Sequence, residues 1–75
     1  MSDTPVKRIK IGLISATIWA NESDKGAPRY SITIVRNYLK DESWNETSSF
    51  GVSDLPIVSK IADLALAEVL ALQSE

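Results

Sequence analysis

The sequence contains no cysteine and no histidine. Disulfides, thiolate nucleophiles, most zinc and iron sites and the commonest general acid–base group are therefore excluded. The three glycines, Gly12, Gly26 and Gly51, are isolated and cannot form a phosphate-binding loop. We therefore expect a protein that is not an enzyme, has no catalytic residues and holds no metal ion or cofactor.

Long apolar runs are also missing. No stretch approaches the roughly 20 apolar residues of a membrane-spanning helix, and the first five residues lack the layout of an export signal. Both features favour a cytoplasmic protein without membrane contact. The 75 residues make one small domain. A domain of this size buries only about 60% of the surface that its unfolded chain exposes, so a partner adds needed stability.

The last third of the chain predicts one long helix, at about residues 54–73. Its few polar residues include Ser59, Lys60 and Asp63, which share one face. The rest of the circumference is apolar, which is more than a single sheet can cover. We therefore expect a homodimer, with a tetramer left open. The predicted interface residues are Leu64, Leu66, Leu70 and Leu72.

Three segments before the helix have strand character, at about residues 7–20, 29–39 and 44–50, and residues 1–6 are predicted to be a disordered tail. In the first segment the apolar alternation changes phase near Gly12, which indicates a bulge or a bend there, or a strand that is buried on both sides. If this long segment is divided, the number of strands rises to four. The predicted fold class of the domain, residues 7–75, is α+β. It is an antiparallel meander of three strands, or four, with one C-terminal helix packed on one face.

Charge is unevenly distributed, although the net charge is only −2. Residues 5–40 hold seven basic and two acidic side chains, whereas residues 41–75 hold one basic and seven acidic side chains. Strand alternation places Trp19, Arg29 and Thr33 on the sheet face turned away from the helix. Basic and aromatic groups on an open face are typical of proteins that bind single-stranded DNA or RNA. The candidate nucleic-acid-binding residues are Lys10, Trp19, Lys25, Arg29, Thr33 and Arg36.

The aromatic residues also have structural roles to consider. The alternative for Trp19 is to cover the end of the hairpin and to pack on Tyr30 or Tyr38 across the sheet. Trp44 and Phe50 are predicted to share one face of the third strand and to pack in the core.

A second function is also consistent with the sequence. The acidic turn at Asp41 and Glu42 would repel a phosphate backbone that passes close to it. It fits better with a structural or regulatory module that binds another protein through a sheet edge and does not bind nucleic acid.

Several segments resemble a family of small bacterial proteins of unknown role, and the likeness covers most of the chain. The segments are residues 16–22, 29–33, 48–51, 54–56 and 60–65. The order of strands followed by one helix is also similar to that of single-stranded nucleic-acid-binding folds of the Whirly, PUR-alpha and transcriptional-coactivator type. That similarity implies a sheet that faces nucleic acid and a dimer formed through the helices or around them.

Overall fold

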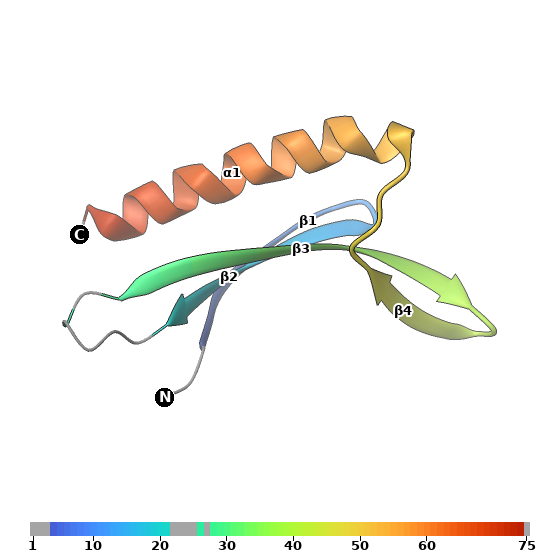
Figure 1. The fold of residues 1–75 in the computed structure, drawn as a ribbon, viewed down its shortest axis with the longest axis horizontal. Helices are drawn as coiled ribbons and strands as arrows, with labels where there is room; N and C mark the ends of the chain where they lie inside the picture. Colours follow the sequence, from blue (N-terminus) through green and yellow to red (C-terminus); the bar gives the residue numbers. More distant parts are fainter. Residues whose placement is uncertain (1–3, 22–25, 27, 75) are drawn as a thin grey trace.

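The computed structural model describes residues 4–21, 26 and 28–74. It confirms the α+β class: a four-stranded antiparallel sheet in the order β1-β2-β3-β4, with one helix across one face (Figure 1). Within the described residues, no helix combines the length and apolar character that crossing a membrane requires. The elements are β1 (Thr4–Ile11), β2 (Ile14–Asn21), β3 (Arg29–Lys40), β4 (Ser43–Thr47), the 3-10 turn η1 (Val52–Asp54) and α1 (Leu55–Gln73).

The first predicted strand, residues 7–20, is two strands joined by a tight turn at Gly12 and Leu13. Gly12 has a φ of +60°, which is typical of the first central position of a type II′ turn. The change of phase in the sequence therefore reflects a reversal of the chain rather than a bulge. The strand β1 begins at Thr4, so the second half of the segment expected to be a tail, residues 1–6, belongs to the sheet.

The strands β3 and β4 are also joined by two residues, Asp41 and Glu42. Both have positive φ, at 51° and 66°, as a type I′ turn requires. The twist of this turn matches that of the flanking strands, but neither residue is the glycine or asparagine that adopts it most easily. The hairpin is therefore held in a conformation that its own turn residues disfavour.

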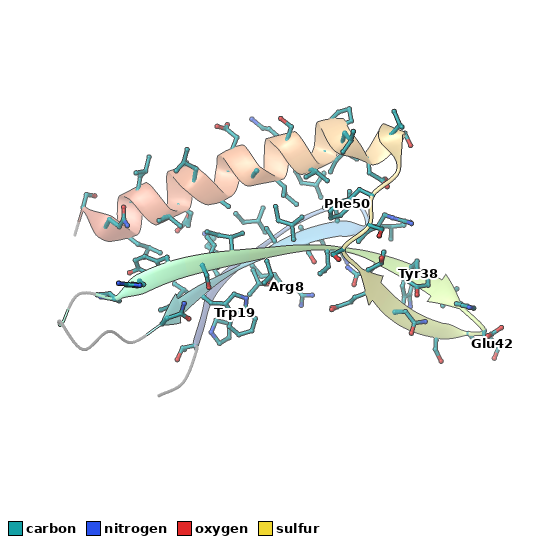
Figure 2. The ribbon with its side chains drawn as sticks, in the orientation of Figure 1. Arg8, Trp19, Tyr38, Glu42 and Phe50 are labelled. Carbon is teal, nitrogen blue, oxygen red and sulfur yellow. The ribbon has the colours of Figure 1, made fainter. Side chains whose placement is uncertain are left out.

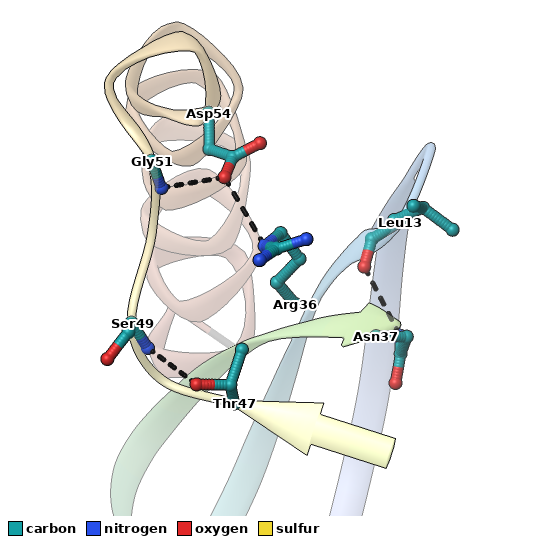
Figure 3. A network of polar contacts seen from close by, with 7 residues as sticks. All are labelled: Leu13, Arg36, Asn37, Thr47, Ser49, Gly51 and Asp54. Carbon is teal, nitrogen blue, oxygen red and sulfur yellow. Dashed lines mark hydrogen bonds and ion pairs between the residues drawn. The ribbon is translucent and has the colours of Figure 1, made fainter. Parts of the chain in front are cut away.

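The third predicted strand, residues 44–50, is shorter than expected, because β4 ends at Thr47. The Thr47 side chain accepts a hydrogen bond at 3.1 Å from the backbone N–H of Ser49, which turns the chain out of the sheet (Figure 3). Phe50 therefore leaves the strand and lies between the helix and the sheet (Figure 2). The prediction that Phe50 packs in the core is confirmed.

The core lies between one stripe of α1 and the strand β2. The stripe recurs at the helical spacing of four residues, and the alternate residues of β2 that face it are apolar. Ile61 on the helix and Ile18 on the strand have no exposed surface. The buried apolar residues are Ile14, Ala16, Ile18, Ile61, Ala65 and Val69.

Polar contacts fix the start and the flank of the helix on the sheet. The Gly51 N–H donates to Asp54 Oδ2 at 2.8 Å, and Arg36 Nε of β3 lies 3.3 Å from the same oxygen (Figure 3). On the other side, Lys7 Nζ of β1 lies 3.6 Å from Glu68 Oε1. Such partly exposed pairs are each worth about 1 kcal/mol at most, so they orient the helix more than they stabilise it.

The buried stripe generates the first prediction. Ile61→Ala should lower the free energy of unfolding by about 2–4 kcal/mol, because it removes apolar contacts and leaves a cavity. Urea unfolding followed by circular dichroism measures the change. The matched control is Leu64→Ala on the same helix, which is 36% exposed and should lose less than about 1 kcal/mol. Equal losses for both variants would contradict the assigned packing face.

The strained hairpin turn generates the second prediction. Glu42→Gly should raise the free energy of unfolding by about 1 kcal/mol, because a glycine adopts positive φ without steric cost. Thermal and urea unfolding measure the change. Glu46→Gly in β4 is the control, and it should destabilise the protein because glycine weakens a strand. A destabilised Glu42→Gly variant would show that the turn residues make other favourable contacts.

Candidate nucleic-acid interface

Strand pairing separates the residues of the sheet onto two faces, since residues directly opposite each other in antiparallel strands point the same way. The inner face meets α1. We call the other one the outer face; Arg8 and Trp19 project from it, away from the helix (Figure 2). The pairing assigns to this face Pro5, Arg8, Lys10, Ser15, Thr17, Trp19, Asn21, Arg29, Ser31, Thr33, Val35, Asn37, Leu39, Trp44 and Glu46.

Trp19 is half-buried on the outer face and is held in place by a side chain of the neighbouring strand. Its Nε1–H donates to Thr33 Oγ1 at 3.0 Å. Tyr30 is opposite Ala20, one residue along from Trp19, and Tyr38 shares the parity of Tyr30 in β3. Both tyrosines therefore belong to the inner face, so the alternative in which Trp19 packs on one of them is wrong. The indole ring is left at the surface with its N–H already satisfied.

Trp44 also lies on the outer face, which corrects the prediction that it packs in the core. It is 64% exposed and is opposite Leu39 at the start of β4. The two-residue turn at Asp41 and Glu42 sets the parity of β4 and thereby decides which way Trp44 points. Phe50 lies beyond the end of β4, so the predicted alternation from Trp44 to Phe50 does not apply.

Two hollows open on the outer face, with volumes of about 530 and 390 Å³. Trp19 and Thr33 line the first, and Trp44 and Lys10 line the second. Arg8 lines both hollows, so it stands between the two tryptophans. Each tryptophan therefore borders its own hollow, and the Arg8 side chain borders both.

The charge of this face is mostly positive. Arg8, Lys10 and Arg29 contribute three cations, and Glu46 contributes one carboxylate to the wall of the larger hollow. The two ion pairs found among the described residues belong instead to Lys7 and Arg36. Within the part of the chain that the structure describes, no carboxylate forms an ion pair with these three cations.

The structure places four of the predicted nucleic-acid-binding residues on the outer face: Lys10, Trp19, Arg29 and Thr33. Arg29 lies at the other end of the sheet from Lys10 and lines neither hollow. Arg36 does not belong with these four residues. It pairs with Ile14 on the inner face and contacts Asp54 at the start of the helix. Lys25 lies outside the described residues.

Sequence reasoning missed two residues of the outer face, Arg8 and Trp44. Arg8 shares the strand parity of Lys10, so alternation within residues 7–11 alone was enough to place it. The orientation of the Trp44 side chain depended on the length of the turn before it. A two-residue loop is a common hairpin connection, but Asp41-Glu42 is not one of the sequences that signal it.

The four predicted interface leucines do not form one patch. Leu66 lines a groove with residues of β3, and Leu70 lies one helical turn further on the same flank. Both are 55% exposed. At 100° per residue Leu64 projects from the opposite flank of α1, and Leu72 is half-buried on the sheet side.

Comparison with protein-family models, with curated proteins and with solved structures found no match. The likeness to small bacterial proteins and to Whirly or PUR-alpha folds therefore stays an expectation. Among the described residues there is no group of three or more carboxylate side chains placed to hold a metal ion. The outer face offers groups for non-covalent contacts with a ligand, namely aromatic rings, cationic side chains and hydroxyl groups.

Proposed function

We propose that the protein binds single-stranded DNA or RNA on the outer face, without catalysis. The observation that carries this proposal is that the two tryptophans line two hollows on the same face of the sheet, and that Arg8 lines both hollows. Bases of a single strand stack on exposed aromatic rings, and the adjacent guanidinium and ammonium groups attract the phosphates. Lys10 and Arg29 extend the positive charge on either side of this centre.

The proposed binding has little sequence preference, because many polar groups of the face already bond within the protein. The Asn21 side chain donates to Ser31 Oγ at 3.2 Å, and the Asn37 side chain donates to the Leu13 carbonyl at 3.3 Å. Such groups are the ones that read base edges. Stacking and phosphate contact remain, and both are tolerant of sequence.

The central residues generate the third prediction. Trp44→Ala should weaken binding of an oligonucleotide by about 1–3 kcal/mol, because it removes one stacking surface. Arg8→Ala should weaken binding and also reduce the slope of log K against log salt by about 0.7, because one phosphate contact is lost. Fluorescence anisotropy with a labelled single strand at several salt concentrations measures both quantities.

Lys60→Ala is the matched control, since Lys60 is an exposed cation of α1 that lies away from the sheet. It should leave both the affinity and the salt slope nearly unchanged. No binding by the wild-type protein at tens of micromolar in low salt, or an affinity indifferent to salt, would refute the proposed function. If Lys60→Ala and Arg8→Ala weakened binding equally, the oligonucleotide would be attracted by the charge of the whole molecule rather than by the outer face.

The acidic residue of the larger hollow generates the fourth prediction. Glu46→Gln should tighten binding several-fold at low salt, because the carboxylate repels phosphates that enter the hollow. Glu68→Gln on the opposite side of the sheet, where Glu68 pairs with Lys7, should have a smaller effect. Unchanged affinity in Glu46→Gln would place the nucleic-acid path away from β4.

A protein partner is the second candidate function. It is favoured by the acidic turn of Asp41 and Glu42. This turn projects with the β3–β4 hairpin beyond the N-terminal end of α1 (Figure 1). The absorbance ratio at 260 and 280 nm of freshly purified protein discriminates between the two candidates. A high ratio indicates that nucleic acid copurifies, whereas a stoichiometric protein without nucleic acid supports the alternative.

A further inference from the structure

The strand β3 is paired on both sides along only part of its length. The strand β2 pairs with it from Arg29 to Arg36, but β4 pairs with it only from Arg36 to Lys40. Among the described residues, no strand pairs with the segment from Arg29 to Val35 on the β4 side, so this segment is an open sheet edge. We call this segment the β3 edge.

The backbone groups of the β3 edge can be assigned from the ladder. The N–H of Asn37 donates to the carbonyl of Leu13 at 2.7 Å, so the odd-numbered residues of β3 bond towards β2. The even-numbered residues of β3 bond towards the other side. Tyr30, Ile32 and Ile34 consequently present their N–H and C=O groups to the open edge.

The β3 edge lacks the features that prevent an open strand edge from pairing with another chain. Open edges are commonly protected by proline, lysine, bulges or very short length. The opposite edge of the sheet is protected in this way, because β1 carries Pro5, an irregular register at Val6 and a series of basic residues. The strand β4 is only five residues long. Between Tyr30 and Val35, by contrast, there is no charge and no proline.

An apolar groove of about 280 Å³ runs beside the β3 edge on the inner face. Ile32 and Ile34 form one wall of the groove, and Ala62 and Leu66 of α1 form the other. Ile32 is 40% exposed and Leu66 is 55% exposed. An unpaired edge and an uncovered apolar wall therefore occur side by side.

We propose that a second copy of this chain pairs with the β3 edge, antiparallel and about a twofold axis at Ile32. In this register Ile32 faces Ile32 of the other copy, and Tyr30 faces Ile34. All of these residues present their backbone groups outward, so each pair exchanges two hydrogen bonds. The interface is self-complementary, as a twofold dimer requires.

The side chains also fit this register. Arg29, the one charged residue of the β3 edge, falls opposite the uncharged Val35 rather than opposite its own copy. Tyr30 opposite Ile34 is an aromatic and β-branched pair of the kind that stabilises sheets. The partner that best matches the uncharged β3 edge is therefore the β3 edge of a second copy.

The twofold axis that relates the strands is perpendicular to the sheet, so both helices stay on the inner side. The flanks of α1 that carry Leu66 and Leu70 then face one another across the paired isoleucines. Each copy covers the groove of the other. The two outer faces become one continuous surface, but the proposal concerns a separate surface and does not depend on nucleic-acid binding.

The solution mass tests the proposal, with one pair of matched variants on the same helix. Leu66→Lys should raise the dimer dissociation constant by about tenfold or more, because it brings like charges together across the axis. Leu64→Lys makes the same change two residues away on the opposite flank and should leave the dimer intact. Sedimentation velocity over a dilution series, with circular dichroism to confirm folding, measures both.

Hydrogen exchange followed by NMR provides a second readout that does not depend on the variants folding. In the wild-type protein the amides of Tyr30, Ile32 and Ile34 should be protected, and dilution towards the monomer should release them. The amides of Ser31 and Thr33 bond to β2 and should stay protected in both states.

A wild-type chain that is monomeric at high concentration overturns the proposal, and so does rapid exchange of the three even-numbered amides in a dimer. Equal dissociation by Leu64→Lys and Leu66→Lys also overturns it, because the contact would then involve both helix flanks. A dimer that binds no oligonucleotide supports this inference and refutes only the proposed function. A monomer that binds an oligonucleotide supports the proposed function and overturns this inference.

Discussion

A single helix is too narrow to cover a four-stranded sheet, and the rest of the structure depends on that limit. With its side chains a helix is about 10 Å wide, whereas neighbouring strands lie about 4.8 Å apart, so one helix covers about two strands. Here α1 packs its buried stripe mainly on β2. The strand β3 is left with Ile32 exposed beside the helix. The outer face has no covering layer among the described elements, so its tryptophans and basic side chains are accessible to a ligand.

Two short turns decide which side chains reach the outer face. Each hairpin loop of the β1–β2 and β3–β4 pairs has two residues, so the residues that flank it lie directly opposite each other. Arg8, Trp19 and Trp44 consequently arrive on the same side of the sheet. A turn one residue longer in either place would shift the register of a whole strand and move its side chains to the other face.

The sequence was sufficient to predict the elements whose physical signals are local. The apolar periodicity of α1 and the alternation of β3 are such signals, and both elements are found close to their predicted limits. The change of phase near Gly12 was visible in the sequence, but it was interpreted as a bulge or a bend, whereas the structure has two strands joined by a turn. The orientation of Trp44 was not predictable in the same way, because it depends on a two-residue turn with positive φ at both Asp41 and Glu42, and a glutamate seldom adopts positive φ. The role of Arg36 depends on Asp54, a partner that only the folded chain brings near.

The contrast between the two long edges of the sheet would also limit the assembly that we propose. Pairing through β3 would use the only long bare edge of the described residues, and the edges left over would be the two β1 strands and the five-residue β4 strands. The β1 strands carry proline, an irregular register and positive charge. In the proposed dimer a third copy would find no long bare edge to extend, so association would stop at two copies instead of growing into a fibre. The N-terminal strand would then act as a terminator of polymerisation.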